Sequence, residues 1–300
     1  MAADGNIGAP SPPMSDTSDS FLAEHPELLE DDRTSRTAQR VVAALVRPLA
    51  AYHSVRSSGW DNVPRQGGCL LIANHNIAAI QEAFILLREW TRNLPDRPAR
   101  GLMHRIAWHA PFKWFPVLQW IGGVFAHPEV SRRALARGDA LLVFPGGDVQ
   151  AMRSFQDRYK IDLYGRIGFV RMARETGVPI VPTVLCGAHA TYFMLPGAAK
   201  LTSLIPVRKW FGVKAVPITA GAVASLGMVA SSLAMPLLWP AALATLAQAA
   251  IALPSRIDIE VLPPITVRPD ESDEAAAERV RQAMQDAMDR MAKNRVTPWF

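Results

Sequence analysis

Short apolar runs punctuate the chain at residues 69–74, 140–147 and 178–187, and each is only six to ten residues long. Runs of this length, bounded by turn residues, are typical of strands that are buried on both faces. A fourth segment of strand character, residues 256–267, follows late in the sequence. We therefore predict four strands, most of them in the interior.

The segments between these strands have helical spacing of apolar residues, at residues 77–92, 129–137 and 166–176. Alternating strands and helices predict an α/β domain, here with a mixed, largely buried sheet flanked by helices. A further helix is expected at residues 270–295, on the surface. Residues 37–53 predict an amphipathic helix interrupted near Pro48, which either packs on the domain or lies on a membrane surface.

One long stretch, residues 215–255, contains 41 consecutive residues without a charged side chain. Prolines divide it, and its longest unbroken piece, residues 218–235, has 18 residues. That length is at the lower edge of the roughly 17 to 25 residues that span a bilayer. We predict an inserted apolar, membrane-associating helical hairpin that dips into one leaflet; one spanning helix and buried core helices are the alternatives.

The charge distribution separates a tail from a body. Residues 1–35 contain eight acidic residues and one basic residue, a net of −7, so the rest carries +12 of the total of +5. Few large apolar groups lie among the first residues, which predicts a disordered acidic tail at 1–35 and one domain at 36–300. The first residues lack the features of a secretory signal, so we expect the protein on the cytoplasmic side of the cell.

A basic body favours anionic partners. No basic helix, zinc-finger spacing or aromatic RNA-binding motif supports nucleic acid, so anionic lipid or a phosphorylated substrate fits better. The two cysteines form no Cys/His cluster with metal-ligand spacing, and we expect no metal. Nucleophile-elbow, Walker and dinucleotide-binding motifs are not found, which disfavours hydrolases, nucleotide-driven enzymes and dehydrogenases.

Three blocks carry the functional signal. Asn74-His75 ends the first apolar run, Phe144-Pro145-Gly146-Gly147 ends the second, and the third contains Val178 to Pro182. In this order and spacing they resemble the lysophospholipid acyltransferase superfamily, over about residues 60–265. The Phe-Pro-Gly-Gly version looks most like the monoacylglycerol and diacylglycerol acyltransferase-like branch.

The resemblance implies an acyltransferase of lipid metabolism and phospholipid biosynthesis, associated with the membrane. Such an enzyme moves a fatty acyl group from an acyl thioester, acyl-CoA or acyl-carrier protein, to a hydroxyl of a lysolipid, glyceride or alcohol. No cofactor beyond the thioester co-substrate is implied.

His75 is the candidate general base, because a histidine at the end of a buried strand lies where α/β folds bind ligands. Its alternative is a histidine that only caps the next helix. The family's acidic residue five positions later is replaced by Ile80, and the nearest carboxylate is Glu82. Seven residues rise about 10 Å along a regular helix, so Glu82 reaches His75 only if residues 76–79 loop back.

Further site residues are expected to contact substrate or stabilise the oxyanion. Gly146 and Gly147 permit a turn that aims N–H groups at developing negative charge, and one arginine is expected to hold a phosphate or carboxylate. The substrate-binding set is Asn74, Arg105, Gly146, Gly147, Asp148 and Arg153. Aromatic residues around Trp108 to Trp120 either line an acyl tunnel, lie at a membrane interface or pack in the core.

Two other classes of protein remain open. A catalytically silent lipid-binding protein would keep the fold without a carboxylate for His75. An integral membrane protein would depend chiefly on residues 215–255. Contact between Glu82 and His75 in the structure would favour the enzyme over the first of these.

Overall fold

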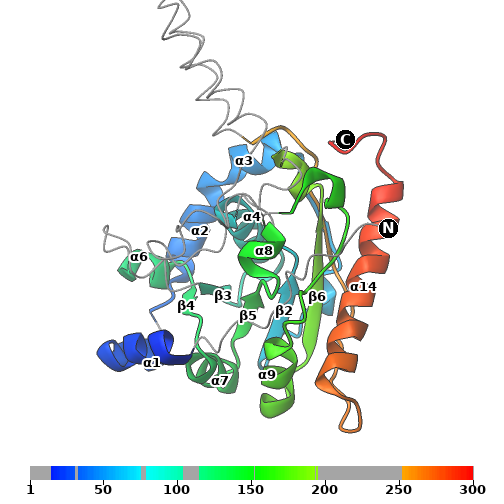
Figure 1. Ribbon diagram of the computed structural model, residues 1–300. Coiled ribbons are helices and arrows are strands. Elements are labelled where there is room, and N and C mark those ends of the chain that lie inside the picture. Colours follow the sequence, from blue (N-terminus) through cyan, green and yellow to red (C-terminus); the bar gives the residue numbers. More distant parts are fainter. Residues whose placement is uncertain are drawn as a thin grey trace, which may run out of the picture.

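The computed structural model describes residues 15–30, 33–75, 79–103, 115–151, 153–192, 194 and 252–299. Within these ranges the chain forms a seven-stranded sheet covered by helices (Figure 1). The strands are β1 (Arg56–Ser58), β2 (Cys69–Ala73), β3 (Arg100–Met103), β4 (Gly123–Phe125), β5 (Ala140–Val143), β6 (Ile180–Cys186) and β7 (Asp258–Val261). Their order across the sheet is β1-β7-β6-β2-β5-β3-β4.

The sheet is mixed, as predicted. Strands β6, β2, β5, β3 and β4 run parallel to one another. Strand β7 pairs antiparallel with β6, and β1 pairs parallel with β7. Because β2, β5 and β6 are parallel neighbours, their carboxyl ends meet at one edge of the sheet, where open α/β sheets bind ligands.

Helices connect the strands and cover both faces of the sheet. They are α1 (Ser15–Glu24), α2 (Arg36–Leu45), α3 (Arg47–Tyr52), α4 (Ala79–Asn93), α6 (Phe115–Trp120), α7 (Pro128–Ala136), α8 (Gly147–Ala151), α9 (Gly168–Thr176) and α14 (Asp273–Lys293). Short 3-10 helices lie at η1 (Pro26–Glu30), η2 (Trp60–Asn62), η3 (Phe155–Asp157) and η4 (Ala188–Thr191).

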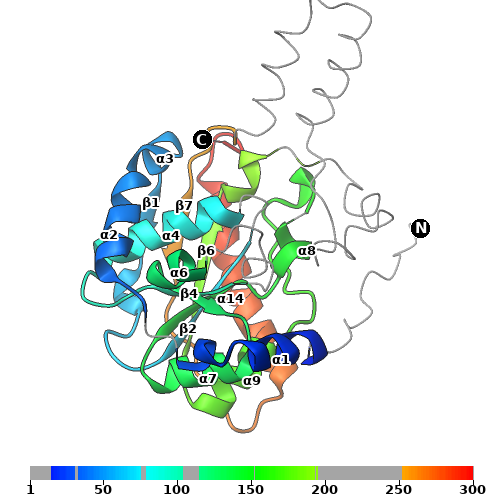
Figure 2. The same ribbon diagram turned by 90° about the vertical axis from the view of Figure 1, so that its left-hand side faces the viewer.

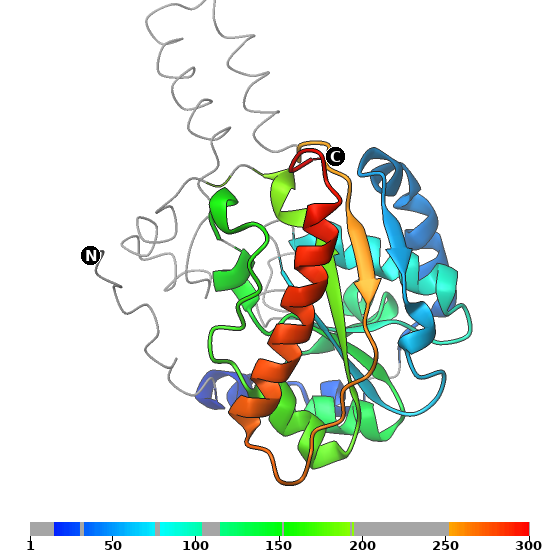
Figure 3. The same ribbon diagram turned by 90° about the vertical axis from the view of Figure 1, so that its right-hand side faces the viewer.

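Strand β2 divides its side chains between the two faces, because successive residues of a strand point in opposite directions. Leu70 and Ile72 join the core cluster to which α7, α9 and α14 contribute. Leu71 and Ala73 face the other way, in the clusters to which α4 contributes. Figure 2 shows α4 with α2 and α3 on one face, and Figure 3 shows α14 crossing the other.

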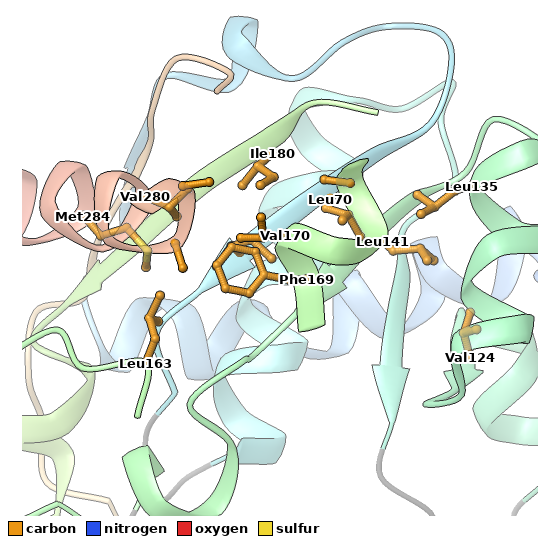
Figure 4. Packing of buried hydrophobic residues seen from close by; sticks show 14 of the residues in the cluster. Leu70, Val124, Leu135, Leu141, Leu163, Phe169, Val170, Ile180, Val280 and Met284 are labelled. Atoms are coloured by element: carbon orange, nitrogen blue, oxygen red, sulfur yellow. The ribbon is translucent and has the colours of Figure 1, made fainter. Parts of the chain in front are cut away.

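The α14 face is held together by an apolar stripe. Val280 and Met284 of α14 lie toward Phe169 and Val170 of α9, over Ile180 of β6 (Figure 4). Val280 and Met284 are one helical turn apart and fully buried. The helix predicted at 270–295 is therefore present, but one side of it is core rather than surface; truncating such residues typically costs about 2 to 5 kcal/mol.

The N-terminal segment differs from the disordered tail that its composition predicts. Residues 15–24 form α1, η1 follows, and Phe21, Leu22 and Leu28 are at most 8% exposed. These three join the same core cluster as β2 and α7. The few apolar residues of the segment are spaced so that they bury together, which composition averaged over 35 residues conceals.

The four predicted strands are present, within shorter bounds, while β1, β3 and β4 were not predicted. Each of these has only three or four residues, and β1 (Arg-Ser-Ser) carries no apolar signal. They depend on their neighbours in the sheet for their hydrogen bonds.

The apolar insertion expected at 215–255 lies outside the described residues except for its last four. In the part of the chain that the structure describes, no helix has both the length and the apolar character needed to cross a bilayer. The membrane-associating insertion stays a prediction.

Candidate active site

The strands of the three sequence blocks end at one edge of the sheet, although Val178 to Pro182 themselves lie at the start of β6. Asn74 and His75 follow β2, the Phe144–Gly147 turn follows β5, and Gly187 follows β6. The three strands are adjacent and in register, with Ile72 opposite both Val143 and Pro182. Parallel pairing thus brings together residues that are up to 113 positions apart in sequence.

His75 and Glu82 are in direct contact, through Nδ1 of the imidazole and Oε1 of the carboxylate. Glu82 lies in the first turn of α4, and His75 precedes this helix, so the rise of a regular helix does not separate them. The predicted contact is confirmed. The carboxylate is 1% exposed and the His75 side chain 15%, so the pair is sheltered while the ring keeps access to the surface.

This contact defines the tautomer of His75. A carboxylate accepts a hydrogen bond, so Nδ1 carries the proton and Nε2 has the free lone pair. One face of the imidazole is covered by Phe144, whose ring is stacked on it with centroids 4.5 Å apart. Nε2 is therefore the atom suited to take a proton from a hydroxyl.

Gln150, in α8, also holds His75 and was not predicted from the sequence. Its Oε1 accepts a hydrogen bond from the backbone N–H of His75 at 2.8 Å. The residue is fully buried. A glutamine six positions after Phe144 has no distinctive spacing, and only the structure reveals the contact.

Asn74 has a different task from the expected substrate contact. Its side chain is fully buried and bonds at both ends to the backbone of Leu185 in β6, with Nδ2 donating to the carbonyl at 3.0 Å. Its Oδ1 accepts from the Leu185 N–H at 2.8 Å. Both groups of the amide thus join β2 to β6 directly beside His75.

The glycine pair forms the turn that the sequence predicts. The N–H of Gly147 donates to the carbonyl of Phe144 at 3.0 Å, and Gly147 has φ +50°, in the region that favours glycine. A side chain at Gly146 would collide with Gln150, at 2.4 Å from its Cβ. The Gly147 N–H is thus used within the turn, which leaves that of Gly146 as the candidate oxyanion donor.

The remaining predicted residues are only partly described. Asp148 lies in α8, but the direction of its side chain is outside the described part, and Arg105 is outside the described residues. Most of the aromatic segment around Trp108 is outside them as well. Trp120 is described, and it is 49% exposed rather than part of a tunnel wall.

Arg153 is buried instead of lying on the surface. Its Nε donates to the carbonyl of Gln150 at 3.2 Å, and its Nη2 lies 3.3 Å from Nε2 of His189. Nη1 is buried and has no hydrogen-bond partner among the described residues, and no ion pair of Arg153 with a carboxylate is observed there. Burial lowers the pKa of Arg153, although a guanidinium stays charged at neutral pH.

His189, in η4 beyond β6, is neutral because of this setting. Burial, reinforced by the charge of Arg153, lowers the pKa of His189 to about 3. Its Nε2 also lies 3.1 Å from the carbonyl of Gln150. The site therefore contains one buried cation, and a neutral histidine beside it.

An apolar pocket lies between α4 and the strands β3 and β5, with a volume of about 80 Å³. Ala83 and Phe84, which directly follow Glu82, contribute to its wall, and Met103 and Leu142 line the sheet side. This volume is well below the roughly 300 to 1,000 Å³ of a typical ligand site. The pocket has room for part of an alkyl chain.

Residues 54–186 match the family model named Acyltransferase. These residues include all three blocks and both members of the His75–Glu82 pair. This region is similar to acyltransferases. The match begins just before β1 and ends with β6.

A solved structure has a similar fold. The 1-acyl-sn-glycerophosphate (LPA) acyltransferase PlsC of Thermotoga maritima matches it with a TM-score of 0.52 and 16% sequence identity. The match covers 86% of this chain and 81% of PlsC. At this level of identity the likeness concerns the fold alone.

Among curated proteins, this chain is similar to an uncharacterised protein of Mycobacterium tuberculosis, at 32% identity over 186 residues. An uncharacterised Mycobacterium leprae protein is 31% identical over 182 residues. Both matches cover 59% of this chain, which spans about half the length of these relatives.

Phytyl ester synthase 1 of Arabidopsis thaliana is 30% identical over 134 residues, covering 41% of this chain and 18% of the plant protein. This match fits the branch that the Phe-Pro-Gly-Gly block indicates.

Proposed function

We propose that this protein transfers a fatty acyl group from acyl-CoA or acyl-carrier protein to a hydroxyl of a glycerolipid or lipid-like acceptor, with His75 as the general base. The contact between Glu82 and Nδ1 of His75 carries the proposal. A silent lipid-binding protein has no need of a buried carboxylate on this histidine, so the contact favours catalysis over that alternative.

In this mechanism Nε2 of His75 takes the proton of the acceptor hydroxyl as its oxygen attacks the thioester carbonyl carbon. Glu82 stabilises the imidazolium that forms. The tetrahedral intermediate carries its negative charge on the former carbonyl oxygen. In the proposal this oxygen accepts a hydrogen bond from the N–H of Gly146. The C–S bond then breaks, and the imidazolium returns the proton to the leaving thiolate.

Arg153 is the proposed contact for an anionic group of the substrates. A buried guanidinium with an unused N–H is costly unless a ligand supplies an acceptor. Acyl-CoA, the carrier's phosphopantetheine and lysophosphatidate all carry phosphate, which arginine binds well. The acceptor stays open among lysophosphatidate, a neutral glyceride and a long-chain alcohol.

The acyl chain is proposed to enter the apolar pocket beside α4. Its wall continues directly from Glu82 through Ala83 and Phe84, so an acyl group held at His75 has apolar surface next to it. Because the pocket is small, the rest of the chain would lie along other apolar surface or remain in lipid.

We further propose that the enzyme works on the cytoplasmic face of a membrane. Helices α2 and α3 present Val41, Leu45 and Tyr52 to solvent, at 54%, 74% and 45% exposure. Arg40 and Arg47 are exposed on the same helices. Apolar residues flanked by arginine suit the interface of an anionic bilayer.

A product assay with purified full-length protein tests the proposal. Labelled acyl-CoA and acyl-carrier protein are offered with lysophosphatidate, monoacylglycerol and a long-chain alcohol, and ester products are separated by chromatography. We expect an ester from at least one pair and a loss of about 100-fold or more in kcat for His75→Ala. No ester with any pair, or full activity of His75→Ala in folded protein, would refute it.

A further inference from the structure

The side chain and the backbone carbonyl of Gln150 make polar contacts with several segments of the site. Its Oε1 accepts from the N–H of His75 at 2.8 Å, and its Nε2 donates to the carbonyl of Asp162 at 3.0 Å. Its own carbonyl lies within hydrogen-bonding distance of Nε of Arg153 and Nε2 of His189. The side chain thus bridges the end of β2 and the loop before α9 from within the core.

The glycine turn is shaped around this side chain. A Cβ atom at Gly146 would lie 2.4 Å from Cβ and 2.5 Å from Oε1 of Gln150, closer than real contacts allow. The relevant Gln150 atoms lie near the backbone and in a bonded amide, so they cannot move aside freely. Gly146 therefore leaves the space in which Gln150 reaches His75, and this accounts for glycine at that position.

We infer that Gln150 is a positioning residue for acyl transfer, which fixes the peptide of His75 so that its ring meets both Glu82 and the acceptor hydroxyl. The inference rests on the proposed role of His75. Glu82 and Phe144 hold the ring, and Gln150 is the side chain seen to hold the backbone from which the ring extends.

Loss of the hydrogen bond between Gln150 and the N–H of His75 is expected to affect catalysis more than substrate binding. Without this acceptor the partly buried N–H of His75 loses its hydrogen bond, which favours a shift of the peptide toward another partner. A displacement of about 1 Å between reacting groups can lower turnover by about 100-fold. Acyl donor and acceptor contacts elsewhere are unchanged, so KM should change little.

The competing explanation is that Gln150 only braces the loop around Asp162. Gln285 of α14 provides a matched control, because it binds the same loop in the same manner. Its Oε1 accepts from the N–H of Ile161 at 2.7 Å, and its Nε2 donates to the carbonyl of Tyr159 at 3.0 Å. Gln285 has no contact with His75 among the described interactions.

The experiment compares Gln150→Met, Gln150→Glu and Gln285→Met with wild-type full-length protein and His75→Ala. Methionine keeps the volume of glutamine without an oxygen acceptor, whereas glutamate keeps the oxygen. For Gln150→Met we expect kcat to fall at least about tenfold with KM within about twofold. Gln150→Glu should retain a higher kcat than Gln150→Met, and Gln285→Met should keep wild-type kcat.

Three results would overturn the inference: wild-type kcat in Gln150→Met, an equal fall of kcat in Gln285→Met, or a kcat of Gln150→Glu no higher than that of Gln150→Met. Circular dichroism and urea unfolding establish that each variant is folded. Activity in His75→Ala would instead refute the general base itself. An inactive His75→Ala with a fully active Gln150→Met would refute only the role of Gln150.

Discussion

The carboxylate of Glu82 contacts Nδ1 of His75, although seven residues separate them and the position that the family uses is occupied by Ile80. The contact arises because His75 precedes α4 while Glu82 lies in its first turn. An acidic residue two positions later than usual thus reaches the same nitrogen. The departure from the family pattern leaves the proposed base with a carboxylate partner.

Glu82→Gln should lower kcat by at least about tenfold, equivalent to about 1.4 kcal/mol of barrier. Glutamine can hold the ring but supplies no charge for the imidazolium, so KM should change little. Steady-state kinetics measure both. Glu89→Gln is the control, because Glu89 is equally buried on the same helix but accepts from Ser57 instead. Wild-type kinetics in Glu82→Gln would contradict the pairing's role.

Arg153→Met should raise KM for a phosphorylated co-substrate about tenfold, while the free energy of unfolding changes by less than about 1 kcal/mol. Replacing a buried charge that lacks a carboxylate partner by an apolar side chain is often neutral for stability. Arg158→Met is the control, since Arg158 lies nearby over the ring of Phe155. A marked loss of stability with unchanged KM would indicate a structural role for Arg153.

Leu28→Ala should destabilise the protein by about 2 to 4 kcal/mol, because Leu28 is 1% exposed in the main core cluster. Urea unfolding measures the change, and kcat of the folded enzyme should stay the same. Leu45→Ala, at a leucine that is 74% exposed, should be nearly neutral. Equal stabilities of the two variants would mean that the N-terminal segment is not packed as described.

Stability should decline as the pH falls from about 6.5 toward 3, in part because of His189. The folded pKa of about 3 lies below the ordinary value of 6.5, so in this window the unfolded chain binds the proton and the folded chain does not. The stabilisation is complete above 6.5 and is lost on acidification. Urea unfolding at pH 7.0, 5.5 and 4.5 should show a smaller decline in His189→Gln than in wild type. His25→Gln, at an exposed histidine, should follow the wild-type decline.

Leu45→Glu combined with Val41→Glu should weaken binding to vesicles that contain anionic lipid, because a carboxylate on the apolar face opposes insertion and is repelled by the headgroups. Co-sedimentation with vesicles measures the bound fraction. Arg281→Glu is the control, because it changes the net charge by the same two units and lies on α14, away from this surface. Unchanged binding of the α2 variant with loss in the control would place the lipid contact elsewhere.

The sequence by itself determined the central strands, the helices between them and the choice of His75 as the candidate general base. Strands β2, β5 and β6 are continuous apolar runs, and short runs of this kind indicate strands that are buried on both faces of a sheet. The order and spacing of the three blocks were sufficient to indicate a resemblance to the acyltransferase family. Glu82 was a candidate as well, as the nearest carboxylate to His75 in the sequence.

Only the tertiary structure decided what these residues contact. Whether Glu82 reaches His75 depends on where α4 begins, and helix boundaries are poorly specified by local pattern. The sequence places Leu28 in an acidic tail, whereas the structure shows its segment packed against the core. Gln150 has no distinctive signal in the sequence, and its contact with His75 follows from its place in α8. Arg153 was a candidate in the sequence, but only the structure shows that it is buried beside His189. Contacts between distant segments follow from how strands and helices pack together, and the local spacing of apolar residues does not specify that packing.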